Sequence, residues 1–143
     1  MSARKRLGAL DYARLLAFRV ALRRFLRWSE DQAATVGLTP AQHQLLLAIR
    51  GHSDPRGPNV GELADYLCVR HHSAVQLIDR TEQVGLVARS RDDKEDRRVV
   101  RLTLTAAAAQ KLAQLSTTHL DELHRLSTLI DELVDADDPA ANP

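Results

Sequence analysis

The chain has 143 residues, of which 44% are hydrophobic, 27% charged and 3% aromatic, with a formal net charge of +1. This length suits one domain, or one domain with an oligomerisation appendage, and the composition is that of an ordinary soluble globular protein. No apolar run approaches the roughly 20 residues that cross a bilayer, and no secretory leader pattern opens the chain. The single cysteine, Cys68, excludes an internal disulfide. We therefore expect a cytoplasmic protein with no membrane partner.

Charge is unevenly distributed along the chain. Before residue 28 there are eight basic residues and one acidic residue, whereas from His119 onward there are seven acidic residues and one arginine. Such asymmetry indicates a polyanionic partner near the basic parts, although a solvated surface would carry the same charges.

The first predicted helix runs from Leu7 to about Ala34. Apolar residues recur along it at intervals of three and four, which gives the helix one apolar face. The next segment, VGLTPAQ, supplies a stop and a restart, because Gly37 suits a left-handed C-cap and Thr39 opens a capping box. A second helix therefore begins at Pro40 and ends before the Gly/Pro-rich loop GHSDPRGP.

Two further helices and a hairpin follow that loop. A short helix of about seven residues is expected in NVGELADYLCV, with Val60 as a candidate stub of strand before it. A longer helix is expected in RHHSAVQLIDRTEQVG, where Gly85 suits the position just past the helix end. Two helices joined by so short a turn form a helix-turn-helix unit. LVARS and VVRLTLT then alternate as half-buried strands do, and the charged stretch between them closes an antiparallel hairpin.

The last predicted helix is N-capped by Thr105 and extends over roughly 30 residues. Its apolar residues step by three and four for nearly two heptads, so it also has one apolar face. One small domain cannot bury two such faces against its own hairpin module. We expect the two long helices to pack against each other and against a second copy, which gives a symmetric homodimer with His119 as a polar residue in its seam.

A helix-turn-helix followed by a hairpin is a winged helix, a mainly α fold with a small β-hairpin wing whose physical use is DNA binding. The second helix of the pair enters the major groove with its N-terminus first, so its exposed residues meet base edges or phosphates. We expect Gln76 to pair with adenine, Arg70 to reach guanine or phosphate, and Arg80 to contact phosphate. The DNA-binding residues predicted on this helix are Arg70, His71, His72, Ser73, Gln76 and Arg80.

The stretch GELADYLCVRHHSAVQLIDRTEQVGLVARSRDDKEDRRVVRLTLT resembles the winged helix-turn-helix core of the MarR (multiple antibiotic resistance regulator) family. The resemblance extends from the first long helix to the last and is most specific in GLVAR and DRRVVRLTLT. The family's Asp-x-Arg wing motif falls on Asp96 and Arg98. The resemblance implies that this arginine reaches into the minor groove while the aspartate holds the wing's arginines in place. The DNA-binding residues expected in the wing are Arg91, Lys94, Asp96, Arg97 and Arg98.

The resemblance implies a homodimeric transcriptional regulator, more often a repressor than an activator, that is released from a pseudo-palindromic operator by a small molecule or by oxidation. It also implies an effector pocket between the dimerisation helices and the DNA-binding lobe. Residues 7–36 and 105–134 would form the dimerisation region, 37–104 the DNA-binding domain and 135–143 a flexible acidic tail. The residues expected in the effector pocket by position are Tyr12, Arg19, Trp28, His43 and Leu47.

Three positions depart from the family's pattern. Arg70 stands where a small polar residue often precedes the recognition helix, which weakens the N-cap unless the helix starts as late as Ser73. Thr81 stands where leucine is common, so we expect looser packing there. The four alanines after Thr105 replace a glycine, so we expect the last helix to start more smoothly.

Other functional classes receive little support from the residues. Cys68 with His71 and His72 lacks the distant fourth ligand of a zinc site, so we expect no metal or other cofactor. The position of Cys68 inside the helix-turn-helix favours a buried structural cysteine over a redox sensor. No Gly-x-Ser-x-Gly, phosphate-binding loop or facing carboxylate pair indicates an enzyme. The alternative to a regulator is a dimeric winged-helix scaffold or antirepressor that no longer binds DNA.

Overall fold

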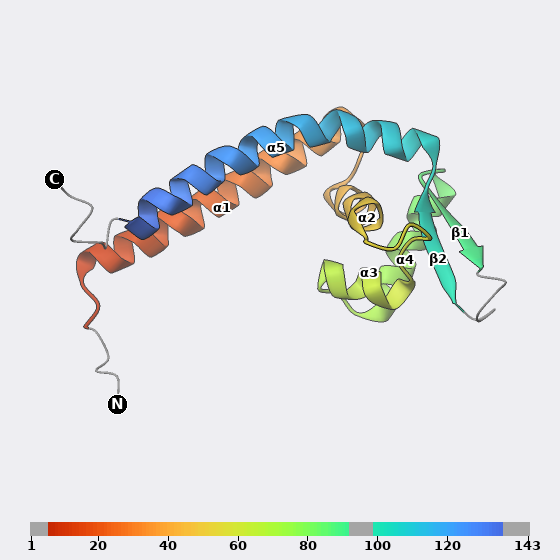
Figure 1. Ribbon diagram of the computed structural model, residues 1–143, viewed down its shortest axis with the longest axis horizontal. Helices are drawn as coiled ribbons and strands as arrows, with labels where there is room; N and C mark the ends of the chain where they lie inside the picture. The colour runs from red at the N-terminus through yellow and green to blue at the C-terminus, as the bar shows by residue number, and fades with distance from the viewer. Residues whose placement is uncertain (1–5, 92–98, 136–143) are drawn as a thin grey trace. The chain divides into compact units, whose positions relative to one another are not determined.

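The computed structural model describes residues 6–91 and 99–135 (Figure 1). The element order is that expected from the sequence, with five helices and a two-stranded hairpin among the described residues. The chain divides into two compact units, one of residues 1–31 and 118–143 and the other of residues 32–117. The elements are α1 (Ala9–Thr35), α2 (Pro40–Gly51), α3 (Val60–Leu67), α4 (His71–Gln83), β1 (Val87–Arg91), β2 (Val100–Leu104) and α5 (Ala106–Asp135).

Local capping sets the starts of α2 and α3, as the sequence predicted for α2. The Gln42 backbone N–H donates to Thr39 Oγ1 at 3.1 Å, and the Thr39 N–H donates to Gln42 Oε1 at 3.0 Å. Asn59 and Glu62 make the same reciprocal pair at α3. Each capping box satisfies two backbone donors that the first helical turn leaves without partners. The predicted start of α2 at Pro40 is confirmed.

The turn between α3 and α4 corrects one expectation. Cys68 is the C-cap of α3, with a left-handed backbone (φ 53°), and its side chain is exposed rather than buried. Its backbone N–H donates to the Asp65 carbonyl oxygen at 3.2 Å, which closes the helix end. The prediction of a buried cysteine was wrong because a left-handed C-cap turns the chain at the surface of the helix pair.

The core of the unit spanning residues 32–117 gathers side chains from every helix and both strands in it. Large side chains with no measurable exposure include Leu45 and Leu46 of α2, Leu63 of α3, Ile78 of α4 and Leu102 of β2. Leu112 and Leu115 of α5 join this cluster. This aliphatic core agrees with an aromatic content of only 3%.

The hairpin is antiparallel, with Val87 opposite Leu104 and Arg91 opposite Val100. The loop after α2 packs directly against β2, because the Leu102 N–H donates to the Pro58 carbonyl oxygen at 2.9 Å. At Gly57 (φ +96°) a Cβ atom would lie 2.1 Å from the Leu102 carbonyl oxygen, so only glycine fits there.

An isolated bridge joins Asn59 to Arg101 beside the hairpin. The strand stub that the sequence suggested at Val60 therefore lies one residue earlier, and Val60 itself begins α3.

The start of α5 is tied to the end of α4. Thr105 Oγ1 donates to the Gly85 carbonyl oxygen at 2.7 Å and accepts from the Ala108 N–H at 3.3 Å. Gly85 has a φ of +78°, as expected for the residue past a helix end. The predicted N-cap at Thr105 is confirmed, and α5 continues through all four alanines without interruption.

In the other unit, α1 and α5 run antiparallel side by side (Figure 1). Arg14 Nε donates to the Leu133 carbonyl oxygen at 2.6 Å, where a cation meets the negative end of the α5 dipole. Ser29 Oγ lies 2.7 Å from His119 Nε2. Within a single chain, therefore, His119 pairs with α1.

Candidate nucleic-acid interface

Helix α4 has two faces of opposite character. Ala74, Ile78 and Thr81 show no measurable exposure and lie in the core. The remaining side of the helix carries most of the residues that the sequence predicted for DNA binding. Of these, Arg70, His71, His72, Gln76 and Arg80 are exposed, and Ser73 is half-buried. The structure thus brings the predicted recognition residues together on one helix whose opposite face is anchored.

The N-terminus of α4 begins at His71, with Arg70 as its N-cap residue in an extended conformation (φ −71°, ψ 154°). No side-chain hydrogen bond caps this end, which confirms the weak N-cap expected from an arginine at this position. The Arg70 side chain therefore makes no capping bond, and the backbone N–H groups of the first turn lie beside three cationic or titratable side chains. Such a helix end favours an anionic partner.

Thr81 packs fully into the core of the unit, at the position where leucine is common in the MarR family. Its Oγ1 donates to the Leu77 carbonyl oxygen at 2.7 Å. The hydroxyl group is therefore satisfied inside the helix, and burying it leaves no polar atom without a partner.

Arg89 of β1 binds the C-terminal half of α4. Its Nη1 donates to Glu82 Oε1 at 2.7 Å, and its Nη2 pairs with Asp79 Oδ1. These two carboxylates raise the pKa of the Arg89 guanidinium above its ordinary value, chiefly through the Asp79 hydrogen bond. The role of Arg89, the last residue of GLVAR, was not predictable, because nothing in the sequence pairs a strand residue with two helix residues.

A second cluster of charges lies where the loop after α2 meets β2. Arg56 Nη2 lies 2.8 Å from Asp54 Oδ2, and Arg101 Nη1 lies 3.7 Å from the same oxygen while donating to the Gly57 carbonyl oxygen at 2.9 Å. The Arg56 hydrogen bonds hold the pKa of Asp54 well below its usual range. The sequence had identified this segment only as a Gly/Pro-rich loop.

Of the residues predicted in the wing, the structure describes Arg91, which is exposed at the end of β1. The others, Lys94, Asp96, Arg97 and Arg98, lie outside the described residues. The role of Asp96 in holding the wing's arginines therefore stays a prediction, as does the minor-groove contact of Arg98.

The predicted effector residues are divided between the two units. Tyr12, Arg19 and Trp28 belong to α1 in the unit of paired long helices, where Tyr12 and Arg19 are exposed. His43 and Leu47 belong to α2 in the other unit, where His43 is buried and Leu47 is 48% exposed. Leu47 lines a small hollow of about 280 Å³ together with Tyr66 and Leu67.

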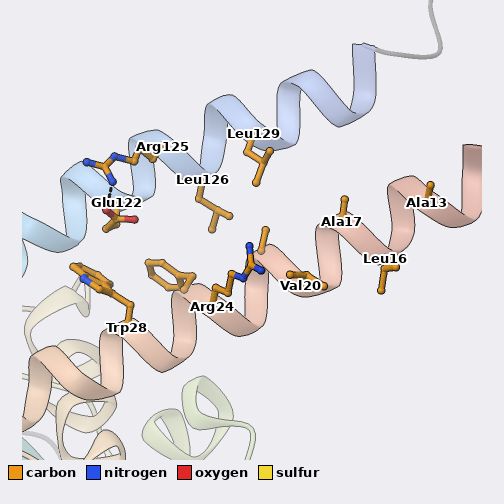
Figure 2. Close-up of a pocket in the computed structure, with 12 residues that line it drawn as sticks. Ala13, Leu16, Ala17, Val20, Arg24, Trp28, Glu122, Arg125, Leu126 and Leu129 are labelled. Carbon is orange, nitrogen blue, oxygen red and sulfur yellow. Dashed lines mark ion pairs between the residues drawn. The ribbon is translucent and has the colours of Figure 1, made fainter.

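Trp28 lines a larger cavity of about 1030 Å³ between α1 and α5. Figure 2 shows Leu126 and Leu129 directed from α5 toward α1, with the Glu122–Arg125 ion pair at one side. The Trp28 ring also lies 4.7 Å from the His119 ring, centroid to centroid. The walls of this cavity are mostly apolar, and its lining residues include Leu16, Val20, Phe25, Trp28, Leu126 and Leu129.

Two structural features are absent from the described part of the chain. Residues 6–91 and 99–135 contain no group of three or more His, Cys, Asp or Glu side chains placed to hold a metal ion. Among the same residues, no helix is long and apolar enough to cross a membrane.

Comparison with known proteins identifies the central segment. The sequence model of the MarR family matches residues 36–99. The HTH-type transcriptional repressor MdtR of Bacillus subtilis (strain 168) is 38% identical over 69 residues, which are 48% of this chain. The match spans 42% of the length of that repressor.

Two solved structures share the fold over most of the chain. A MarR family protein from Bacillus stearothermophilus gives a TM-score of 0.70 at 23% identity, over 85% of this chain and 82% of that chain. The MepR–DNA complex of S. aureus gives 0.68 at 17% identity, over 84% and 89% of the two chains. Residues 36–99 are therefore similar in sequence to the MarR family, and the chain has the winged helix-turn-helix fold of solved MarR-family structures.

Proposed function

We propose that the protein is a sequence-specific DNA-binding transcriptional regulator, acting as a repressor. The observation that carries this proposal is the division of α4 into a fully buried face and an exposed face that bears Arg70, His71, His72, Gln76 and Arg80. A helix anchored in this way can enter the major groove as a rigid element. The likeness to MdtR, a repressor by name, and to MepR, solved on DNA, supports the same function.

Within this proposal the residues of α4 have separate tasks. Gln76 can make a bidentate pair with the N6 and N7 atoms of adenine, and Arg70 can bind guanine or phosphate. Arg80, whose Nε lies 3.4 Å from the Gln76 carbonyl oxygen, is placed one turn further along for a phosphate. Arg91 and Arg98 of the wing would contact the backbone and minor groove beside them.

The proposed regulator acts as a homodimer. The unit of paired long helices exposes many large apolar side chains, among them Leu10 (80% exposed), Leu16 (63%) and Leu123 (56%). Large apolar side chains exposed in this number mark an interaction surface. A two-fold axis through this surface would place two copies of α4 on successive major grooves of a pseudo-palindromic operator.

A small-molecule effector would regulate the dimer from a site that includes one of the predicted effector residues, Trp28. Trp28 contributes to the cavity of about 1030 Å³ between α1 and α5, a volume in the upper range for small-molecule sites. An effector bound at the dimerisation helices would change the spacing of the two α4 helices, which the operator requires to be fixed.

The decisive experiment is selection of duplexes from a random DNA library with the full chain, followed by a gel-shift titration of the selected duplex at several salt concentrations. We expect a pseudo-palindromic sequence whose binding weakens as salt increases, because each phosphate contact releases counterions. A chain that ignores all DNA at low salt would overturn the regulator and favour a dimeric scaffold or antirepressor of the same fold.

Two substitutions assign the contacts within that complex. Gln76→Ala should cost about 1–3 kcal/mol at particular base pairs of the selected duplex. Arg98→Ala should weaken binding to selected and unrelated DNA alike and reduce the salt slope by about one. If Gln76→Ala were silent on every sequence while His72→Ala relaxed specificity, the assignment of Gln76 would be wrong.

A further inference from the structure

One arginine joins the wing to the recognition helix. Arg89 in β1 binds Glu82 through Nη1 at 2.7 Å and Asp79 through Nη2. Asp79 and Glu82 are three residues apart on α4 and therefore share one face of that helix. A single guanidinium thus bridges two carboxylates of the helix and makes a two-pronged link between the elements.

The bridge lies next to the residues proposed to read DNA. Asp79 comes three residues after Gln76 and immediately before Arg80, both of which are exposed. Carboxylates in this place would repel phosphates, and a DNA-binding surface has no evident use for two of them. The contacts of Arg89 explain the two carboxylates, because Asp79 and Glu82 bind its side chain and its positive charge partly neutralises theirs.

The strand carries the link onward to a second DNA-binding residue. Alternate residues of a strand share a face, so Val87, Arg89 and Arg91 point to one side of β1. Val87 is buried in the core and Arg89 binds α4, which shows that this side is turned toward the helix. Arg91 follows on the same side, two residues or about 7 Å further along. The position of Arg91 relative to Gln76 therefore depends on the Arg89 bridge.

We propose that Arg89 is a positioning residue for sequence recognition, whose bridge to Asp79 and Glu82 holds α4 and β1 at the spacing at which Gln76 and Arg91 engage the same site on DNA. This inference rests on the proposed function, since it requires α4 to read DNA. Asp79 and Glu82 then contribute to sequence specificity, although their negative charge alone would weaken DNA binding.

The test uses a substitution for which net charge and positioning predict opposite changes in DNA affinity. Asp79→Asn makes the protein more positive, so electrostatics alone would tighten its binding to every duplex. If the bridge positions the helix and wing, Asp79→Asn instead weakens binding to the selected duplex about tenfold, while binding to an unrelated duplex of equal length stays the same or tightens. Asp65→Asn, which removes one exposed carboxylate from α3, is the matched control and should not lower the ratio of the two affinities.

Arg89 itself is tested by charge exchange. Arg89→Gln should lower affinity for the selected duplex about tenfold without changing the salt slope on unrelated DNA, whereas loss of a direct phosphate contact would reduce that slope by about one. The paired change Arg89→Asp with Asp79→Arg should regain most of the lost discrimination, because it restores an ion pair between the same two positions.

The outcomes separate this inference from the proposed function. If the wild type selects no sequence, the regulator itself is rejected. If the wild type discriminates but Asp79→Asn binds both duplexes as tightly as Asp65→Asn does, the positioning role is rejected. Thermal unfolding monitored by circular dichroism accompanies each variant. Glu82→Gln, which leaves the Asp79 link in place, replaces any variant that is unfolded at the assay temperature and should show the same loss of discrimination to a smaller extent.

Discussion

The two compact units treat their apolar side chains in opposite ways. In the unit of residues 32–117, leucines and isoleucine from α2, α3, α4 and β2 are fully buried within one chain. In the unit of paired long helices, leucines of both α1 and α5 remain more than half exposed. The first unit is complete in a single chain, whereas the second has apolar surface left over. This exposed apolar surface on regular helices is the reason for which we propose that a second copy covers it.

The largest effect should come from placing a charge on the exposed apolar surface of the paired long helices. Leu16→Glu introduces a carboxylate at a position of α1 that is 63% exposed in the single chain and that a second copy would cover. Because the symmetric interface would bury two such carboxylates, self-association should weaken by about 4 kcal/mol, or roughly a thousandfold in dissociation constant.

Sedimentation velocity over a range of protein concentrations measures this change. Leu47→Glu is the matched control, since Leu47 is also about half exposed but belongs to the other unit. Equal dissociation constants for wild type and Leu16→Glu would show that the long helices are not the interface.

The complete unit should respond most strongly to truncation in its core. Leu46→Ala removes a side chain with no measurable exposure, so the free energy of unfolding should fall by about 3 kcal/mol through lost burial and the cavity left behind. Leu47→Ala on the next position of α2 should cost well under half as much, because that side chain is 48% exposed. Urea denaturation at fixed protein concentration compares the two variants, and similar losses would contradict the burial assigned to α2.

A smaller effect is expected where α5 joins the complete unit. Thr105→Ala removes the hydroxyl group that accepts from the Ala108 N–H and donates to the Gly85 carbonyl oxygen. Loss of this N-cap should lower the free energy of unfolding by about 1 kcal/mol. Thr105→Ser keeps both hydrogen bonds and is the control, so a serine variant as unstable as the alanine variant would place the effect in the lost methyl group.

The smallest effect concerns pH and the ion pairs of Asp54 with Arg56 and Arg101, where the loop after α2 meets β2. Because the pKa of Asp54 is lowered in the folded state, its ion pairs with Arg56 and Arg101 stabilise the fold above the ordinary carboxyl pKa and are lost as pH falls below it. Asp54→Asn should therefore reduce the loss of thermal stability between about pH 5 and pH 2.5. Thermal melts across this range test the change, with Asp65→Asn as the control, and an unchanged pH dependence would assign acid sensitivity to other carboxylates.

Much of the fold was predictable because its signals are local. The capping box at Thr39, the glycine at position 85 and the N-cap at Thr105 each depend on residues within a few positions, and all three are confirmed. The exposed face of α4 followed from helical periodicity in the same way. The exposure of Cys68 was not predictable, because it depends on a left-handed backbone at a turn that the sequence does not specify.

The sequence by itself determined the element order, the starts of α2 and α5, the exposed face of α4 and the apolar faces of the two long helices, since all of these follow from spacing along one chain. Only the tertiary structure decided that Arg89 binds Asp79 and Glu82, that Arg101 reaches Asp54 and that the loop at Gly57 packs against β2. These contacts join residues on different elements. Their existence depends on how helix and strand lie together in space, which no periodicity records.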